Sequence, residues 1–149
     1  MLQLEVGSVF IWMYMRTATV LFLVLISVTY TIAESPKKCT STEAKRARAE
    51  AGHVQDWNSI YSSFKRFGHC DSGRVAEEYA YAVSRLLAHH WEDVEVVLGL
   101  AAGDKNFQQF VLRHINEDIP EEEAQLIVIN SRQHCPPNGK WLCDAIVDY

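Results

Sequence analysis

The sequence lacks the short motifs that mark common catalytic and cofactor sites. It contains no HExxH helix motif and no Gly-x-Ser-x-Gly turn, and its seven glycines are too scattered to form a phosphate-binding loop. It also has no Cys-x-x-Cys pair, which excludes a zinc knuckle, a thioredoxin-type redox motif and a c-type haem attachment. We therefore predict no catalytic residues, no bound metal and no cofactor.

Positive charge is also in short supply. The chain has 14 Lys and Arg against 19 Asp and Glu, a formal net charge of −5. Nucleic-acid phosphates require clustered basic side chains, so we expect no nucleic-acid partner. The one basic cluster follows the N-terminal apolar stretch and is interpreted as the solvated face of a first helix; it comprises Lys37, Lys38, Lys45, Arg46 and Arg48.

Only one long apolar run occurs, and it lies near the N-terminus. Arg16 precedes the apolar residues 18–28, and the small-residue ending Thr31-x-Ala33 follows. This order is typical of a signal peptide, so we predict residues 1–33 to be cleaved and the mature protein, residues 34–149, to be periplasmic or secreted. Residues 1–14 are interpreted as a misassigned start. The alternative is an uncleaved anchor over residues 9–33, which would be the protein's only contact with a membrane.

All four cysteines lie in the portion predicted to be exported. They are Cys39, Cys70, Cys135 and Cys143. An even number of cysteines in a small exported domain indicates disulfides, because no cytosolic reductant keeps the thiols free. Two disulfides allow three connectivities.

The remaining residues show the periodicity of helices. Apolar residues recur at three- and four-residue spacing, and Thr40 to Glu43 have the form of a capping box. We expect helices at about 40–51, 56–67, 72–88, 91–100, 104–115 and 120–131, then a short helix or an extended tail. In this pattern Asp71 or Ser72 would cap the third helix, and the core would include the aromatic stripe on the second: Trp57, Tyr61, Phe64 and Phe67. The prediction is a single all-α domain of about six helices with two disulfides.

The helix order favours one pairing of the cysteines. If Gly52 separates two antiparallel helices of similar length, their far ends meet, and a bridge from Cys39 to Cys70 would clamp the hairpin. Cys135 and Cys143 flank the turn-rich Pro136-Pro137-Asn138-Gly139, which a local bridge could close. We therefore predict Cys39–Cys70 and Cys135–Cys143.

Three stretches resemble a group of small exported bacterial proteins, mostly of unknown function. They are WNSIYSSFKRFGHCDSG (57–73), AEEYAYAVSRLLAHHW (76–91) and FQQFVLRHI (107–115), followed by a closing Cys-Pro and Leu-Cys. The resemblance implies export and a helical, disulfide-bonded fold. In size, helix content and disulfides the chain is similar to periplasmic immunity proteins that block amidase toxins of type VI secretion systems, an analogy at the level of the fold. Where the group commonly reads CDDG, this chain has Ser72.

Two classes of function remain open. The first is a binding protein, for example an immunity or inhibitor protein that blocks a cell-envelope toxin by contact, without chemistry of its own; an acidic surface could steer a basic partner. The second is a cell-envelope enzyme acting on peptidoglycan through scattered residues. We favour the first. The predicted contact residues are Asp71, Glu77, Glu78, His89, His90 and Asp93.

Overall fold

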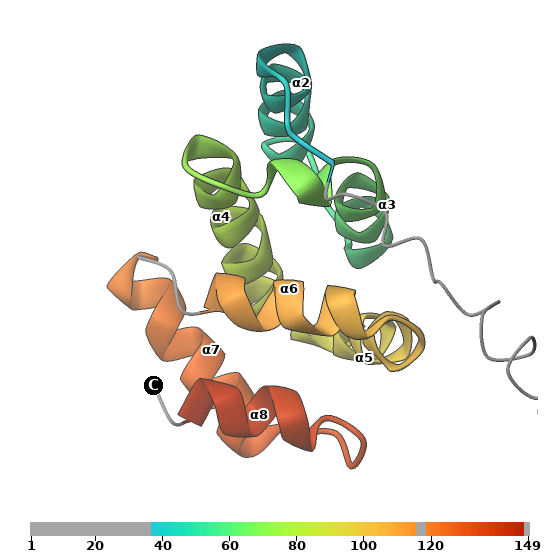
Figure 1. Ribbon diagram of the computed structural model, residues 1–149. Helices are drawn as coiled ribbons and strands as arrows, with labels where there is room; N and C mark the ends of the chain where they lie inside the picture. Colours follow the sequence, from blue (N-terminus) through green and yellow to red (C-terminus); the bar gives the residue numbers. More distant parts are fainter. Residues whose placement is uncertain (1–36, 116–118, 148–149) are drawn as a thin grey trace, which may run out of the picture. The chain divides into compact units, whose positions relative to one another are not determined.

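The computed structural model describes residues 37–115 and 119–147, and these residues form helices without any strand (Figure 1). The predicted all-α class is confirmed. The α-helices are α2 (Ser41–Ala51), α3 (Trp57–Phe67), α4 (Arg74–His89), α5 (Val94–Gly103), α6 (Lys105–Ile115), α7 (Glu121–Gln133) and α8 (Lys140–Val147). Two 3₁₀ turns, η1 (Gly68–Cys70) and η2 (Trp91–Asp93), precede α4 and α5. The predicted signal segment, residues 1–33, lies outside the described residues.

Side chains cap several helices where the sequence predicts them. Thr40 accepts a hydrogen bond from the backbone N–H of Glu43, and the Glu43 carboxylate accepts one from the N–H of Thr40, which completes the predicted capping box. Asp56 caps α3 through the N–H of Ser59, and Asp104 caps α6 through the N–H groups of Asn106 and Phe107. These short-range contacts satisfy donors that the first turn of a helix leaves without partners.

The cap predicted for the third helix is wrong. The residue before α4 is Gly73, with φ +52°, and no side chain caps this helix. A left-handed φ favours glycine, which has no Cβ to clash with the backbone. Asp71 instead turns toward α6, as described below. The apolar segment after α4 also starts anew as η2 and α5, because His90 interrupts the helix with φ −134°.

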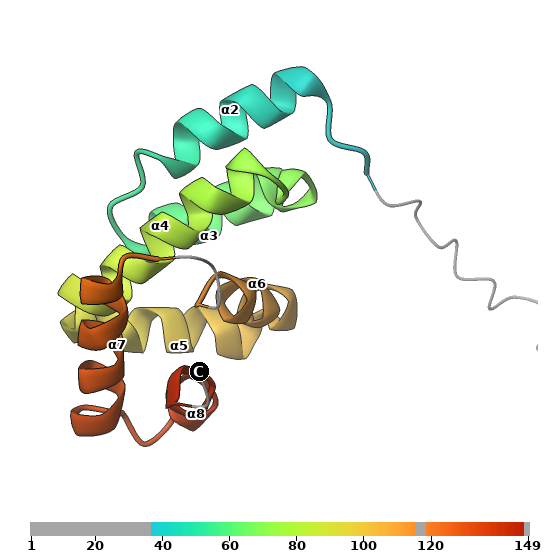
Figure 2. The ribbon, with the colours of Figure 1, turned by 90° about the vertical axis from the view of Figure 1, so that its left-hand side faces the viewer.

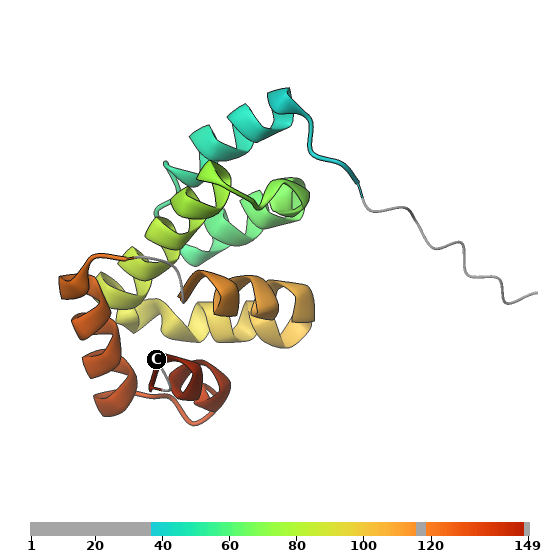
Figure 3. The same cartoon turned by 60° about the vertical axis from the view of Figure 1, so that its left-hand side comes forward.

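Helix α4 lies at the centre of the domain, with α2, α6 and α7 packed around it (Figures 1 and 2). Figure 3 shows α5 and α6 side by side, and α7 beside α8. The core is rich in aromatic rings: Phe110 of α6 lies 5.0 Å from Tyr79 of α4 and 4.9 Å from Phe64 of α3, measured between ring centroids. Such ring pairs stabilise a core by more than the burial of their apolar surface alone would.

Both predicted disulfides are present, Cys39–Cys70 and Cys135–Cys143. The first joins the segment before α2 to η1 and so closes the α2–α3 hairpin. The second closes the turn between α7 and α8. Paired cysteines of this kind are typical of proteins that fold in an oxidising compartment outside the cytoplasm. Of the helices in residues 37–147 that the structure describes, none has both the length and the apolar character needed to cross a membrane.

Candidate partner-binding surface

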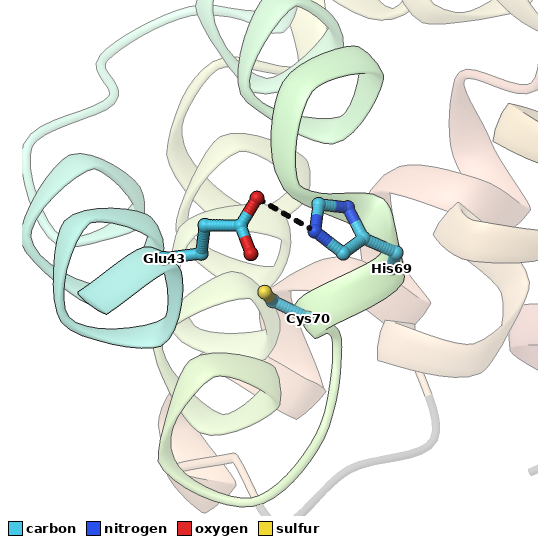
Figure 4. Close-up of side chains that lie close together, drawn as sticks. All are labelled: Glu43, His69 and Cys70. Atoms are coloured by element: carbon cyan, nitrogen blue, oxygen red, sulfur yellow. Dashed lines mark ion pairs between the residues drawn. The ribbon is translucent and has the colours of Figure 1, made fainter. Parts of the chain in front are cut away.

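A polar corner forms where η1 meets the start of α2 (Figure 4). The Glu43 carboxylate lies 3.4 Å from Nε2 of His69 and 2.7 Å from Nζ of Lys37, and it also accepts hydrogen bonds from Thr40. The hydrogen bond from Lys37, followed by those from Thr40, lowers the pKa of Glu43 to about 2. Glu43 is therefore a carboxylate at neutral pH, held by the start of its own helix.

Possible metal ligands approach one another at two places in the described residues. The first is this corner, where ligand atoms of Glu43, His69 and Cys70 lie within 4.8 Å of one another. The Cys70 sulfur is bonded to Cys39 and therefore has no thiolate to offer a metal ion. The second is a fully exposed set on the turn after α4, formed by His90, Glu92 and Asp93. Exposed acidic groups commonly approach in this way without a metal.

The side chain of Asp71 is buried and links the corner to α6. Its side chain is only 3% exposed, and its Oδ1 lies 3.0 Å from Nε2 of His114, which is 1% exposed. The two atoms are at ion-pair distance, but their alignment falls short of a hydrogen bond. Arg113 donates a 2.7 Å hydrogen bond to the other oxygen of Asp71. Burial acts to raise the pKa of Asp71, but His114 and Arg113 outweigh it, and the net shift is downward.

Glu77 and Glu78 lie on the outer side of α4, about one helical turn before Tyr81. Glu77 is exposed and makes no ion pair with any described residue. Glu78 accepts a 3.1 Å hydrogen bond from Nε of Arg48 on α2, and its carboxylate packs beside Gly52. Tyr81 is 52% exposed, the largest exposed fraction among the large hydrophobic side chains of the described segments. This side of α4 therefore combines an aromatic ring with two carboxylates and the exposed Arg74.

The remaining predicted contact residues lie at the other end of α4. His89 and His90 are both exposed, as is Asp93. Nε2 of His89 lies 3.9 Å from a carboxylate oxygen of Glu123 on α7, and Nδ1 of His90 lies 3.6 Å from Glu92. This end of the helix thus presents imidazoles among carboxylates.

The structure places the six predicted residues at three locations. Asp71 lies in the interior, Glu77 and Glu78 lie in the first turns of α4, and His89, His90 and Asp93 lie at its end. Glu77 and His89 are 12 positions apart, which corresponds to about 18 Å of helix. Two exposed groups on one helix could fall within a single protein interface, whose area is roughly 800 Å² on each side. Asp71 does not share that surface.

Sequence analysis missed two residues of this surface. Tyr81 was not singled out, although its helical position places it on the side of Arg74, Glu77 and Glu78, away from the buried Tyr79 and Val83. That signal was present in the sequence. Glu123 lies 39 residues from Ser84, to which it is hydrogen-bonded at 2.8 Å, and a contact between such distant residues leaves no local pattern.

Charge is distributed unevenly over the domain. Residues 37–70, which include α2 and α3, carry seven Lys and Arg and three Asp and Glu. Residues 71–104 carry two Arg and seven acidic residues, and no Lys or Arg occurs from 86 to 104. The start of α7 adds Glu121, Glu122 and Glu123. The surfaces of η2 and of the start of α7 are therefore negative, whereas α2 is positive, and α4 carries two Arg and two Glu.

Two grooves border the positive α2. One, of about 550 Å³, is lined by Glu50, His53, Val54, Asp56, Asn58, Ser59, Ser62 and Arg66; the other, of about 500 Å³ between α2 and α4, is lined by Lys45, Arg48, Ala49, Gly52, His53 and Glu78. In the first groove, both carboxylate oxygens of Asp56 bind Ser59, and Glu50 pairs with Arg66. Their polar groups therefore serve largely to hold the hairpin.

Comparison of the chain with protein-family models, with curated proteins and with solved structures returned no match.

Proposed function

We propose that this protein is an exported, periplasmic binding protein that acts by contact with another protein, as an immunity or inhibitor protein that blocks a cell-envelope toxin does. The observation that carries the proposal is the net negative charge of α4 and η2, which together carry two Arg against four carboxylates. The carboxylates Glu77, Glu92 and Asp93 are exposed on short, rigid helical elements. A surface with a net negative charge steers association with a partner of the opposite sign.

The two disulfides and the predicted signal segment support the compartment in this proposal. Disulfides form and persist in the periplasm and outside the cell. They also support the mode of action, because a domain cross-linked near both ends presents its surface with little loss of conformational freedom on binding. Such preorganisation raises the affinity of a protein contact.

The experiment is affinity capture of the tagged protein, exported with its own N-terminal segment, after mild cross-linking of intact cells. We expect one envelope or toxin protein to be enriched at a fixed ratio, and the complex to weaken as the salt concentration rises. Purified protein incubated with peptidoglycan serves as the control for the enzyme hypothesis. Release of soluble fragments, abolished by replacing a single carboxylate or histidine, would show an enzyme and overturn the proposal.

A further inference from the structure

Metal-ligating side chains surround the first disulfide, at the polar corner between η1 and the start of α2. Ligand atoms of Glu43, His69 and Cys70 all lie within 4.8 Å of one another, and Figure 4 shows the three side chains directed toward a common space. Cys39 adds a second sulfur, because it is bonded to Cys70. Two sulfurs, an imidazole and a carboxylate therefore meet at one place.

The nitrogen and oxygen atoms of this cluster have the spacing of zinc ligands. Zinc in proteins is tetrahedral, with Zn–N and Zn–O distances of about 2.0–2.1 Å, so two such ligand atoms lie about 3.3 Å apart. Nε2 of His69 and Oε1 of Glu43 are 3.4 Å apart. Nε2 is also buried and finds no hydrogen-bond partner among the described residues. A bound ion would give this nitrogen the partner that a buried polar atom requires.

The Glu43 carboxylate is held in a way that leaves one oxygen for a cation. Its Oε2 accepts hydrogen bonds from the backbone N–H and the hydroxyl of Thr40, whereas Oε1 faces His69 and lies 2.7 Å from Nζ of Lys37. The Lys37 ammonium competes with a metal ion for Oε1. Its side chain is 64% exposed and precedes α2, so it can turn into solvent when a divalent ion binds.

We propose that this corner is a redox-gated zinc site. The disulfide form binds no metal, and the dithiol form binds one Zn²⁺ through four ligands: Cys39, Cys70, His69 and Glu43. Thiolate sulfur and imidazole nitrogen are the ligands that zinc takes most often in proteins, and a carboxylate oxygen completes the tetrahedron. The inference goes beyond the proposed function and does not depend on it.

Opening the site requires a dithiol reductant, such as the dithiol of an exported thiol–disulfide exchange protein. Cys39 is exposed and Cys70 is 1% exposed, so a thiolate of the reductant attacks Sγ of Cys39, the S–S bond breaks, and Cys70 leaves as a thiolate. The second thiol of the reductant then displaces Cys39 and closes the reductant's own disulfide. Two electrons pass to the protein. Zn²⁺ takes both thiolates, and the two protons of the dithiol go to solvent.

The test is zinc binding by the full chain, exported with its own N-terminal segment, before and after reduction with a phosphine, which offers no thiol of its own. Competition with a chromophoric zinc indicator measures the affinity, and the absorption of Co²⁺ in place of Zn²⁺ reports tetrahedral thiolate ligation. We expect one Zn²⁺ per reduced chain and none per oxidised chain. The double variant Cys135→Ser, Cys143→Ser should keep this binding, whereas Cys39→Ser, Cys70→Ser should lose it.

Single variants test the other two ligands. Replacing a group that only orients a zinc ligand typically costs about 10–100-fold in affinity, so His69→Gln should weaken zinc binding by the reduced protein at least about tenfold. Glu43→Gln should also weaken it, although a glutamine can still complete the capping box. His90→Gln removes a histidine from the exposed set that contains Glu92 and Asp93, and this matched control should bind zinc as the wild type does.

Reduced protein that binds no zinc, or that binds it as tightly in His69→Gln or in Cys39→Ser, Cys70→Ser as in the wild type, would overturn the inference. Equal affinity of the oxidised and reduced forms would contradict the redox gate. If reduction unfolds the chain, zinc should restore its helical circular dichroism, because an ion that binds only the folded state stabilises it. His69→Gln should abolish that restoration, and an unfolded chain that zinc leaves unfolded would equally reject the site.

Discussion

Asp71 and His114 are 43 residues apart in the sequence, and their side chains meet 3.0 Å apart in the interior of the domain. The pair joins the corner after the first disulfide to α6, and Arg113 holds the second oxygen of the same carboxylate. The geometry of this corner therefore depends on the carboxylate of Asp71, which is almost completely removed from solvent. Buried charges are costly unless partners compensate them, so the corner should be sensitive to changes in either partner.

Replacing Asp71 with Asn should lower the free energy of unfolding by about 2 kcal/mol at pH 7, because His114 and Arg113 lose their charged acceptor. The measurement is urea denaturation. Asp144→Asn is the control: Asp144 pairs with Lys140 at 2.6 Å on the surface, where such pairs contribute little. Equal stability of Asp71→Asn and the wild type would show that the buried contact contributes nothing to the free energy of unfolding.

The same pair should also make stability depend on pH. The folded-state pKa of Asp71 is lowered below its ordinary value, so the contribution of the carboxylate is present above about pH 4 and is lost as the pH falls through the folded pKa. Wild-type protein should therefore lose more stability between pH 5 and about pH 2 than Asp71→Asn does, because the variant lacks this titrating group. Parallel stability curves for the two proteins in acid would contradict this explanation.

The two disulfides should differ in their contribution to stability. Cys39–Cys70 closes a loop of 31 residues and Cys135–Cys143 a loop of 8. By the loop-entropy estimate, removing the first should cost about 3.7 kcal/mol and removing the second about 2.5 kcal/mol. Chemical denaturation of the two double Cys→Ala variants measures the difference. The order would be wrong if loss of the shorter loop were the more damaging, and peptide mapping that joined Cys70 to Cys135 would reject the pairing itself.

Glu77 and Glu78 should respond differently to charge reversal. Glu77→Lys should leave the melting temperature almost unchanged, since Glu77 is exposed and makes no described ion pair. Glu78→Lys should lower the stability by up to about 1 kcal/mol, because it places a second cation beside Arg48. Thermal unfolding of both variants provides the measurement. A larger loss for Glu77→Lys than for Glu78→Lys would mean that Glu77 has a structural role.

The mature protein should begin at Glu34. N-terminal sequencing of the exported form measures this directly, because the predicted cleavage site follows Ala33. A sequence beginning at Met1 or Met15, with the protein in the membrane pellet, would instead support the anchor over residues 9–33.

Much of the fold could be predicted because its signals are local. The capping box at Thr40 and Glu43 spans four residues, and the helical periodicity and the flanking positions of the cysteines are equally short-range. Sequence analysis was wrong about which groups individual side chains contact. Asp71 is of a residue type that commonly caps a helix. Its carboxylate instead contacts Arg113 and His114, which lie more than 40 residues later in the sequence. No local pattern reveals such a competition.

The candidate surface was predicted only in part, for the same reason. Its helix was identified, and Glu77 and His89 lie on the outside as a contact role requires. The place where α7 packs against α4 determines which exposed residues form one surface. The hydrogen bond between Ser84 of α4 and Glu123 of α7 lies at that contact. The packing between helices determines which residues form the candidate surface, and no local sequence pattern predicts that packing.

The association rate of the protein with its captured partner, measured from about 0.02 to 0.5 M salt, tests the central claim most directly. If the net negative charge of α4 and η2 steers a basic partner, the rate should fall steeply with salt, and Glu77→Lys should slow association at low salt while converging on the wild-type rate at high salt. A rate that ignores salt and is the same for Glu77→Lys and the wild type would contradict binding through this surface.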